Sequence, residues 1–501
     1  RTMFRIFNIK KRYFLIIVAT LVHFFVHAQE IPDRPEKLKF SPLVYDPPNP
    51  VDYRVELSSG AIVYIYPDRE RPLIDLSFNI RGGSYLDPDG KEGLAGMTGY
   101  LMARGGIPSK LADELDEELE FLAARLSSNF GGLNGSVSLN LLSKDVDRGF
   151  EILKAVLAAP SFQQDKLDLR KSQVVQQLKK RNDDSSSIES RERNFLAYGD
   201  NFWFNRYLTD VSIESIRRED LLEFHHKWVH PKNFIISVSG DFDRDEMLNR
   251  LNRVLDSWPH KGQLAPQVPQ QQKYGKPGVY IVDKDVNQGR VSIIMPGIRW
   301  DHPDYYAIQI MNDILGGGGF TSRITNRVRS DEGLAYSARS SFPGGAFYPI
   351  VFRAGFQSKS RTVLYAASIV LEEIGKIIKE PVNKEEILTA KKSFIDTFPN
   401  NFSSSSQIVS QFASDEMIGR FSKEKDYWRK YRDRIEAVDI EAVQLVAKKH
   451  LNLDKAIVLI VGQKQSIIDG HPDHPVNLKR LTSGSVQDLP IRNPLSMKPE
   501  K

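Results

Sequence analysis

The chain of 501 residues contains no cysteine. Disulfide bonds and thiol chemistry are therefore excluded, both as a source of stability and as a source of reactivity. Their absence is compatible with an exported bacterial protein. Stability must come from packing, and the 41% of hydrophobic residues provide enough apolar material for more than one core.

Long apolar runs are also scarce, because no segment after residue 28 is apolar over the length that spans a membrane. Residues 1–28 differ, with an apolar core at Tyr13–Phe25 and small residues before Gln29. This pattern predicts a secretory signal cleaved after Ala28, with Met3 as the start of translation and a periplasmic protein as the product. If the segment is not cleaved, it becomes an N-terminal membrane anchor instead.

Excess positive charge is confined to the same segment. The formal net charge of the whole chain is +5, and residues 1–28 contain five basic residues and no acidic residue. The basic residues of this segment are Arg1, Arg5, Lys10, Lys11 and Arg12. The remainder is close to neutral, so the sequence predicts no nucleic-acid partner.

The remainder is predicted to be an α+β protein built from two homologous domains. KAIVLIVGQK near the end resembles NFIISVSGDF, and Gly462 follows Gly240 by 222 residues. Strand and helix patterns mix without a regular βαβ alternation, which favours mixed sheets packed with helices. The predicted organisation is a signal at 1–28, an extended lead-in at 29–50, a first domain at 51–258, a proline-rich linker at 259–278, a second domain at 279–480 and a loose tail at 481–501.

Local patterns in the first half predict a hairpin and a strand within 53–79, and helices from 93 to about 126. Further strands and helices follow from the alternation and periodicity of apolar residues. These are a strand at Asn134–Leu142, helices at 145–158, 163–181, 218–228 and 244–258, and a strand at 234–242.

The stretch Leu315–Phe342, LGGGGFTSRITNRVRSDEGLAYSARSSF, has the most distinctive pattern. A glycine run interrupts the helical pattern that precedes it and leaves a backbone open to close approach. A short amphipathic helix at Ser322–Ser330 and a strand at Leu334–Ser341 are predicted next. The four glycines are Gly316, Gly317, Gly318 and Gly319.

In this arrangement Arg329 lies near a helix C-terminus and Tyr336 at the start of the following strand. A guanidinium and a phenol placed across one turn can both point at one place, where they would donate hydrogen bonds to a polarised carbonyl oxygen. The alternative is a helix C-cap arginine and a half-buried strand tyrosine without a shared function.

The glycine run, Ser322–Arg323, and the segment RSDEGLAYS with Arg329 and Tyr336 resemble the C-terminal half of the pitrilysin (insulinase) family of zinc peptidases. That family includes two-subunit bacterial enzymes and the mitochondrial processing peptidase. The resemblance implies a duplicated fold over Tyr53–Gln465. It also implies that Arg329 and Tyr336 bind the substrate backbone beside the scissile bond, with Gly316–Gly319 as part of the substrate site.

The zinc positions of the family are altered in this chain. Active members carry H-x-x-E-H on a helix of the first domain, and the matching helix GKEGLAGMTGYLMARGG has Gly96, Gly99 and Tyr100 at those places. The third ligand, a glutamate in the family, is replaced by Gln176 or Gln177. Glycine and neutral amides cannot replace these groups, so no zinc is expected in this chain.

Other candidate sites are weaker. His226 and His230 have the i,i+4 spacing of a metal pair, but no third ligand is evident and an aromatic surface helix is the simpler interpretation. The acidic run at 111–120 resembles a solvated helix face. GGGGF lacks the lysine and hydroxyl ending of a phosphate-binding loop.

The resemblance implies one subunit of a heterodimeric metalloendopeptidase. A homologous partner would hold zinc and the general base, and this chain would contribute Arg329 and Tyr336 to binding and oxyanion stabilisation. It would be inactive alone and soluble after signal cleavage. The alternative is a catalytically inert protein that binds peptides or scaffolds an assembly.

Overall fold

The computed structural model describes residues 34, 38, 44–270, 272–482 and 484–500. The predicted signal and most of the predicted lead-in therefore lie outside the described residues. Contacts divide the chain between Tyr45 and Asp46, and the described helices and strands all belong to the unit Asp46–Lys501. None of the helices in the described residues combines the length and apolar character that a membrane span requires.

The first sheet has six strands in the order β1-β2-β6-β3-β5-β4. Strands β2 and β6 are parallel and the other pairs are antiparallel. Residues of β5 alternate between buried and partly exposed positions, as expected for a strand with one face on a core. The strands are β1 Arg54–Glu56, β2 Ile62–Pro67, β3 Leu73–Arg81, β4 Arg125–Phe130, β5 Asn134–Leu142 and β6 Phe234–Gly240.

Most helices of the first half pack their apolar faces against this sheet and form one core. Helix α5, for example, buries Phe150, Leu153 and Val156, the inward positions that its sequence periodicity predicts. The helices are α2 Pro50–Tyr53, α3 Leu94–Arg104, α4 Ala112–Phe121, α5 Val146–Ala158, α6 Gln164–Lys179, α7 Ser185–Tyr198, α8 Asp210–Ser215, α9 Arg218–Trp228 and α10 Arg244–Asp256.

The second sheet has the order β13-β7-β12-β8-β11-β9, with the short β10 beside β8. Its central strand β12 is parallel to β7 and antiparallel to β8, which repeats the mixed pairing around β6 in the first sheet. The strands are β7 Gly278–Asp283, β8 Gln288–Arg299, β9 Ala338–Ser341, β10 Gly344–Gly345, β11 Ile350–Lys359, β12 Ile457–Gly462 and β13 Ser485–Asp488.

A second core forms between this sheet and most helices of the second half. The longest of them, α13, buries an apolar stripe that begins at Val363 and ends at Ile377. The helices are α11 Tyr305–Asn312, α12 Arg323–Thr325, α13 Val363–Lys379, α14 Lys384–Thr397, α15 Ser405–Met417, α16 Arg420–Lys423, α17 Tyr427–Glu436, α18 Ile440–His450 and α19 Lys464–Asp469. The predicted fold class, mixed α/β with sheets packed against helices, is confirmed.

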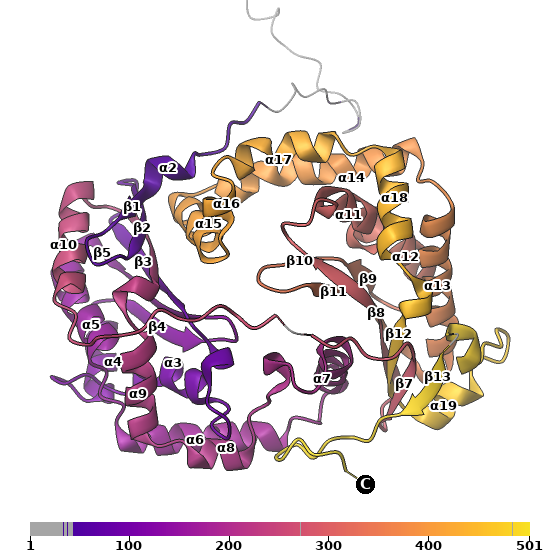
Figure 1. Cartoon of the computed structure of the whole chain (residues 1–501), viewed down its shortest axis with the longest axis horizontal. Coiled ribbons are helices and arrows are strands. Elements are labelled where there is room, and N and C mark those ends of the chain that lie inside the picture. The colour runs from indigo at the N-terminus through magenta and orange to yellow at the C-terminus, as the bar shows by residue number, and fades with distance from the viewer. Residues whose placement is uncertain (1–33, 35–37, 39–43, 271, 483, 501) are drawn as a thin grey trace, which may run out of the picture. The chain divides into compact units, whose positions relative to one another are not determined.

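Each half also lends one helix to the sheet of the other (Figure 1). Helix α7 packs on β8 and β12, and α15 packs on β2 and β6. Glu416 of α15 accepts hydrogen bonds from the Tyr64 hydroxyl at 2.8 Å and from the Arg54 Nε at 3.0 Å. Glu189 of α7 accepts one from the hydroxyl of Ser292. The domain boundaries at 258 and 279 stay a prediction. A helix of each half packs on the sheet of the other half, so the two halves are not separate in their packing.

The tail is not loose as predicted. Strand β13 adds to the second sheet in parallel with β7, and the Arg492 Nε lies 3.0 Å from Glu192 Oε1 on α7. The Nδ2 of Asn182 donates to the carbonyl oxygen of Arg492 at 2.8 Å. The polar composition of the tail concealed this, because ladder hydrogen bonds and ion pairs hold it as well as a few scattered apolar contacts, such as those of Leu489 and Leu495.

Three local predictions also need correction. Residues Arg125–Phe130 form β4, not the end of a helical region. The helix after Tyr305 does not stop at the glycines but continues as a π-helical turn, Asp313–Gly317. The strand predicted from Leu334 begins only at Ala338. Tyr336 therefore lies in an irregular segment, where its backbone is free of ladder constraints.

Candidate functional site

Arg329 and Tyr336 lie together in the structure. The guanidinium carbon of Arg329 is 4.4 Å from the centroid of the Tyr336 ring and also 4.4 Å from the centroid of the Phe320 ring. Both rings reach solvent, since Tyr336 is 84% exposed and Phe320 is 64% exposed. Contact with two aromatic faces restricts the arginine side chain through cation–π attraction. Sequence reasoning missed Phe320, although it directly follows the glycine run.

The backbone between the two residues explains why they meet. Asn326–Asp331 is a π-helical turn, and the amide of Leu334 donates to the carbonyl oxygen of Val328 at 2.9 Å. Gly333 has φ +61°, a conformation that favours glycine. The chain thus reverses tightly, and among the described residues the Tyr336 hydroxyl has no hydrogen-bond partner. It is available to a ligand.

The glycine run has a structural role of its own. A Cβ on Gly316 would lie 2.5 Å from the Ser340 backbone nitrogen, so the π-helical turn approaches β9 only because this side chain is absent. Gly319 has φ +63°, and a Cβ there would meet nothing within 4 Å. Burial raises the pKa of Asp313, which begins the π-helical turn, to about 6. The predicted substrate role of Gly316–Gly319 stays a prediction.

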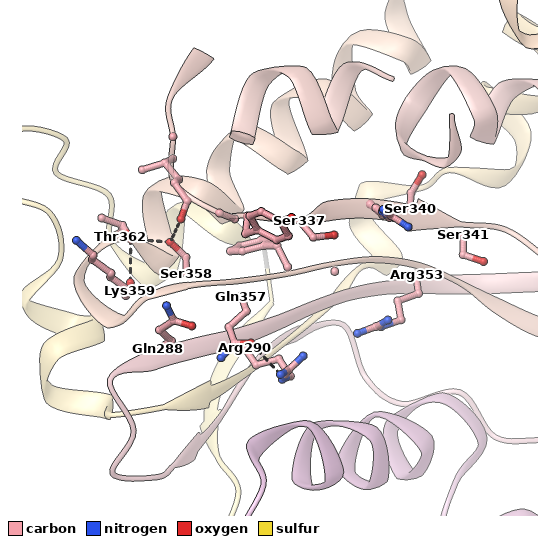
Figure 2. A pocket seen from close by; sticks show the side chains of 17 residues that line it. Gln288, Arg290, Ser337, Ser340, Ser341, Arg353, Gln357, Ser358, Lys359 and Thr362 are labelled. Atoms are coloured by element: carbon pink, nitrogen blue, oxygen red, sulfur yellow. Dashed lines mark hydrogen bonds between the residues drawn. The ribbon is translucent and has the colours of Figure 1, made fainter. Parts of the chain in front are cut away.

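A cavity of about 770 Å³ opens beside Tyr336. It runs along the second sheet over β8, β11 and β9, and its labelled side chains are nearly all polar (Figure 2). Neither Arg329 nor the glycine run lines it. Tyr336 therefore stands between the Arg329 stack and this cavity, at a place where one extended ligand could contact both.

The helix that carries the altered zinc positions is α3. Gly99 is packed against β4 so closely that a Cβ would lie 2.1 Å from the backbone nitrogen of Phe130. The Ser128 hydroxyl links the two elements, donating to the Gly99 carbonyl oxygen at 2.5 Å and accepting from the Ala103 amide at 2.9 Å. The position of the family's catalytic glutamate is thus closed by backbone.

The remaining zinc positions are equally unsuited. A Cβ on Gly96 would meet nothing within 4 Å, so that position is open but bare. The Tyr100 ring is covered by the guanidinium groups of Arg104 and Arg170, at 4.8 and 3.9 Å from its centroid. Gln177 is exposed on α6. Two arginines beside the site would repel a divalent cation, and these residues do not fit zinc.

The histidine helix α9 also forms no metal site among the described residues. His225 is buried, and its Nε2 lies 2.8 Å from the Leu157 carbonyl oxygen. His226 stacks on His260 at 3.7 Å between ring centroids. The Nδ1 of His230 accepts a hydrogen bond from the amide of Lys232. The i,i+4 pair His226 and His230 is therefore used in packing and capping, which supports the simpler interpretation.

In the part of the chain that the structure describes, one cluster brings three metal-ligating side chains together: His302, Asp304 and His450, with ligand atoms within 4.8 Å of one another. The Lys449 ammonium already lies 2.6 Å from Asp304 Oδ2, and the His450 Nε2 is 2.7 Å from the same oxygen. Lys449 supplies the cation here, so the cluster is an ion-pair network. No local sequence pattern signals it, because His450 is 146 residues from Asp304.

The fold and the site thus define a protein built like a zinc peptidase but without the ligands for zinc. Residues 215–394 match the family model described as "Peptidase M16 inactive domain". The predicted resemblance to the pitrilysin-type, or M16, peptidases is confirmed, and residues 215–394 are similar to the domain of the inactive type.

Individual relatives are similar to this chain over most of their length. The non-peptidase homolog YmxG of Helicobacter pylori is 26% identical over 350 residues, which cover 69% of this chain and 79% of that protein. An uncharacterized zinc protease of Mycobacterium bovis is 23% identical over 373 residues, covering 72% of this chain and 82% of that protein. The crystal structure of a peptidase M16 inactive domain from Pseudomonas fluorescens shares the fold, with a TM-score of 0.73 at 24% identity over 82% of this chain and 97% of that chain.

Proposed function

We propose that this chain is the zinc-free subunit of a heterodimeric metalloendopeptidase. The observation that supports this most is the exposed pair Arg329 and Tyr336, stacked in contact while the zinc positions are closed or bare. A protein that had lost all function would have no need of a restrained arginine beside an unpartnered phenol.

In the proposed mechanism the partner supplies zinc, which activates water, and a glutamate that acts as general base. Arg329 holds the peptide backbone beside the scissile bond. The Tyr336 hydroxyl donates a hydrogen bond to the oxyanion that forms on the carbonyl. Its exposure of 84% leaves it accessible to a substrate held between two subunits. The complex is proposed to act in the periplasm after cleavage of the N-terminal signal.

A reconstitution experiment tests this proposal. The mature chain is mixed with a homologous subunit that carries intact H-x-x-E-H, and hydrolysis of peptides is measured. Activity is expected only from the mixture. Tyr336→Phe should lower kcat by about a hundredfold, because one oxyanion donor is worth about 3 kcal/mol of transition-state stabilisation. If the reconstituted complex hydrolyses peptides equally fast after both Arg329 and Tyr336 are replaced, these two residues take no part in catalysis.

A second function has support in the naming of one relative as a non-peptidase homolog. In that case the chain binds peptides, or scaffolds an assembly, without taking part in hydrolysis. The two hypotheses differ in one result of the same experiment: a scaffold would pair with the zinc subunit and leave the hydrolysis rate unaffected by Tyr336→Phe.

A further inference from the structure

The cavity beside Tyr336 is strongly basic. Its lining contains four cationic side chains and no carboxylate. The cationic residues are Arg290, Arg339, Arg353 and Lys359. Acidic and basic residues are nearly balanced over the chain after residue 28, so the positive charge is concentrated at this place.

Strand register explains how these side chains come to share one face. On β11, Arg353, Gln357 and Lys359 alternate with the buried Ala354, Phe356 and Ser358. Arg290 on β8 pairs with Gln357, and Arg339 on β9 pairs with Gly355. Figure 2 shows the side chains of Arg290 and Gln357 next to each other, with Arg353 further along the sheet.

The missing side chain of Gly355 makes room for Arg353 in the middle of this face. The guanidinium of Arg353 lies over the glycine, with Nη2 2.9 Å from where a Cβ would be. Helix α7 packs on β8 and β12, and the cavity is lined by residues of β8, β9 and β11. The Arg353 guanidinium therefore lies over the sheet, between Arg290 on β8 and Arg339 on β9.

Most of this positive charge has no counter-ion within ion-pair distance. Among the described residues, Arg290, Arg339 and Lys359 take part in no ion pair. Asp184 is the carboxylate on which Arg290 acts: hydrogen bonds from Ser186, and then the charge of Arg290, lower the pKa of Asp184. Arg353 reaches Glu189 at 3.4 Å, but Arg193 lies 3.2 Å from the same carboxylate, so one negative charge is shared between two arginines. Burial, with repulsion from Arg193 and Arg290, lowers the pKa of Arg353.

One hydrogen-bond donor in the cavity also has no acceptor. The Nη2 of Arg290 donates to the Gln357 side-chain oxygen at 2.9 Å. Its Nε is buried and has no hydrogen-bond acceptor among the described residues. An unpaired buried donor on a cation costs free energy unless an acceptor arrives, and carboxylates are strong acceptors for guanidinium groups.

We infer that this cavity binds the acidic side chains of an extended peptide, and that the chain therefore selects acidic substrates. The peptide continues past Tyr336, so the inference rests on the proposed function and names its substrate class. A peptide is favoured over a small free anion because the four cations are spread along three strands. One small anion could not contact them all.

Binding to the full chain alone, without a partner and without cleavage, tests the inference. The probe is a fluorescent peptide of about ten residues with three aspartates, compared with the same peptide carrying asparagines. The aspartate peptide is expected to bind about tenfold more tightly. The preference should shrink as salt rises from about 50 to about 300 mM, because screening weakens exposed pairs. Equal affinity for the two peptides would overturn the inference.

Substitutions of the cationic residues test whether the preference for the acidic peptide arises in this cavity. Arg339 and Lys359 are exposed, so the double change Arg339→Gln with Lys359→Gln should fold and bring the ratio of the two affinities close to one. Lys392→Gln, an exposed cation on α14 outside the cavity, is the matched control and should keep the ratio. Arg290→Gln is a second, independent variant with the expected loss. A ratio unchanged by all of the cavity variants would overturn the assignment of the selectivity to this cavity.

Three further outcomes distinguish a small-anion site, a failure of the peptidase function and a failure of the inference. If inorganic phosphate binds as tightly as the aspartate peptide and displaces it fully, the cavity is a small-anion site and the peptide inference is wrong. If the chain prefers the acidic peptide but the reconstituted pair shows no hydrolysis, the inference holds and the proposed peptidase function fails. If the pair hydrolyses peptides without charge preference, the peptidase function holds and the inference is wrong.

Discussion

Gly99 on α3 and Phe130 on β4 are so close that a Cβ on the glycine would lie 2.1 Å from the backbone nitrogen of Phe130. The position at which active relatives carry their catalytic glutamate is thus occupied by the neighbouring strand. Restoring the zinc motif would require the helix and strand to separate, not only a change of side chains. The loss of the zinc motif is therefore accompanied by close packing of α3 against β4 at Gly99.

A pair of glycine substitutions tests this packing. Gly99→Ala should lower the free energy of unfolding by about 2 kcal/mol or more, because the backbone has to shift. Gly96→Ala, one turn earlier, should raise it by about 0.5 to 1 kcal/mol, since the site is open and alanine favours the helix. Urea denaturation followed by circular dichroism measures both. Similar effects at the two positions would contradict the packing argument.

The purified chain is expected to contain no stoichiometric zinc and to hydrolyse no peptide alone. The reason is the absence of ligands and base at Gly96, Gly99 and Tyr100, with Arg104 and Arg170 beside them. Elemental analysis and a chelator-controlled peptidase assay check this. Chelator-sensitive hydrolysis by the chain alone would refute the prediction.

Phe320 should matter to catalysis through Arg329. Phe320→Ala removes one of the two aromatic faces at 4.4 Å, so Arg329 gains freedom and the reconstituted peptidase should lose about threefold to tenfold in kcat/KM. Phe320→Tyr retains the face and should restore most of the rate. Melting temperatures should change little, because Phe320 is 64% exposed. No rescue by tyrosine would argue against a stacking role.

His225 should make the protein sensitive to acid. Burial lowers its pKa to about 3, against about 6.5 in the unfolded chain. The unfolded state therefore binds more protons between these values, and stability falls as pH decreases through this window, by at most about 1.4 kcal/mol per pH unit. His225→Gln should reduce the slope of unfolding free energy between about pH 6 and pH 4. An unchanged slope would mean that other groups dominate.

Glu416 should anchor α15 to the first sheet. It accepts hydrogen bonds from Tyr64 and Arg54 and its side chain is only 11% exposed. Glu416→Gln should cost about 2 kcal/mol, the range for a hydrogen bond to a charged group. Glu436→Gln on the exposed side of α17 is the matched control and should be near neutral. Thermal unfolding of the two variants in parallel provides the comparison.

Sequence reasoning succeeded where the pattern was local and strongly marked. GLAYS and the glycine run predicted the meeting of Arg329 and Tyr336, because the two residues are joined by one short turn. Strand β4 was missed because RLSSNF is polar and follows a helical pattern. Only two of its residues, Ser128 and Phe130, are buried, too few to show a period of two.

The features that could not be predicted depend on pairings between segments that are distant in the sequence. The basic face of the second sheet requires β8, β9 and β11 in register, and Arg290 pairs with Gln357 across 67 residues. The exchange of α7 and α15 is likewise invisible to local periodicity. An amphipathic helix shows that it has an apolar face, but the sequence does not state which sheet that face covers.

The helix exchange has a consequence for how the protein is made. Tyr64 in β2 and its partner Glu416 are separated by 352 residues. Because α15 lies so late in the chain, the apolar face of β2 and β6 that it covers can be buried only after nearly the whole chain has been synthesised. A contact over such a separation forms late in folding, since closure of a long loop must precede it.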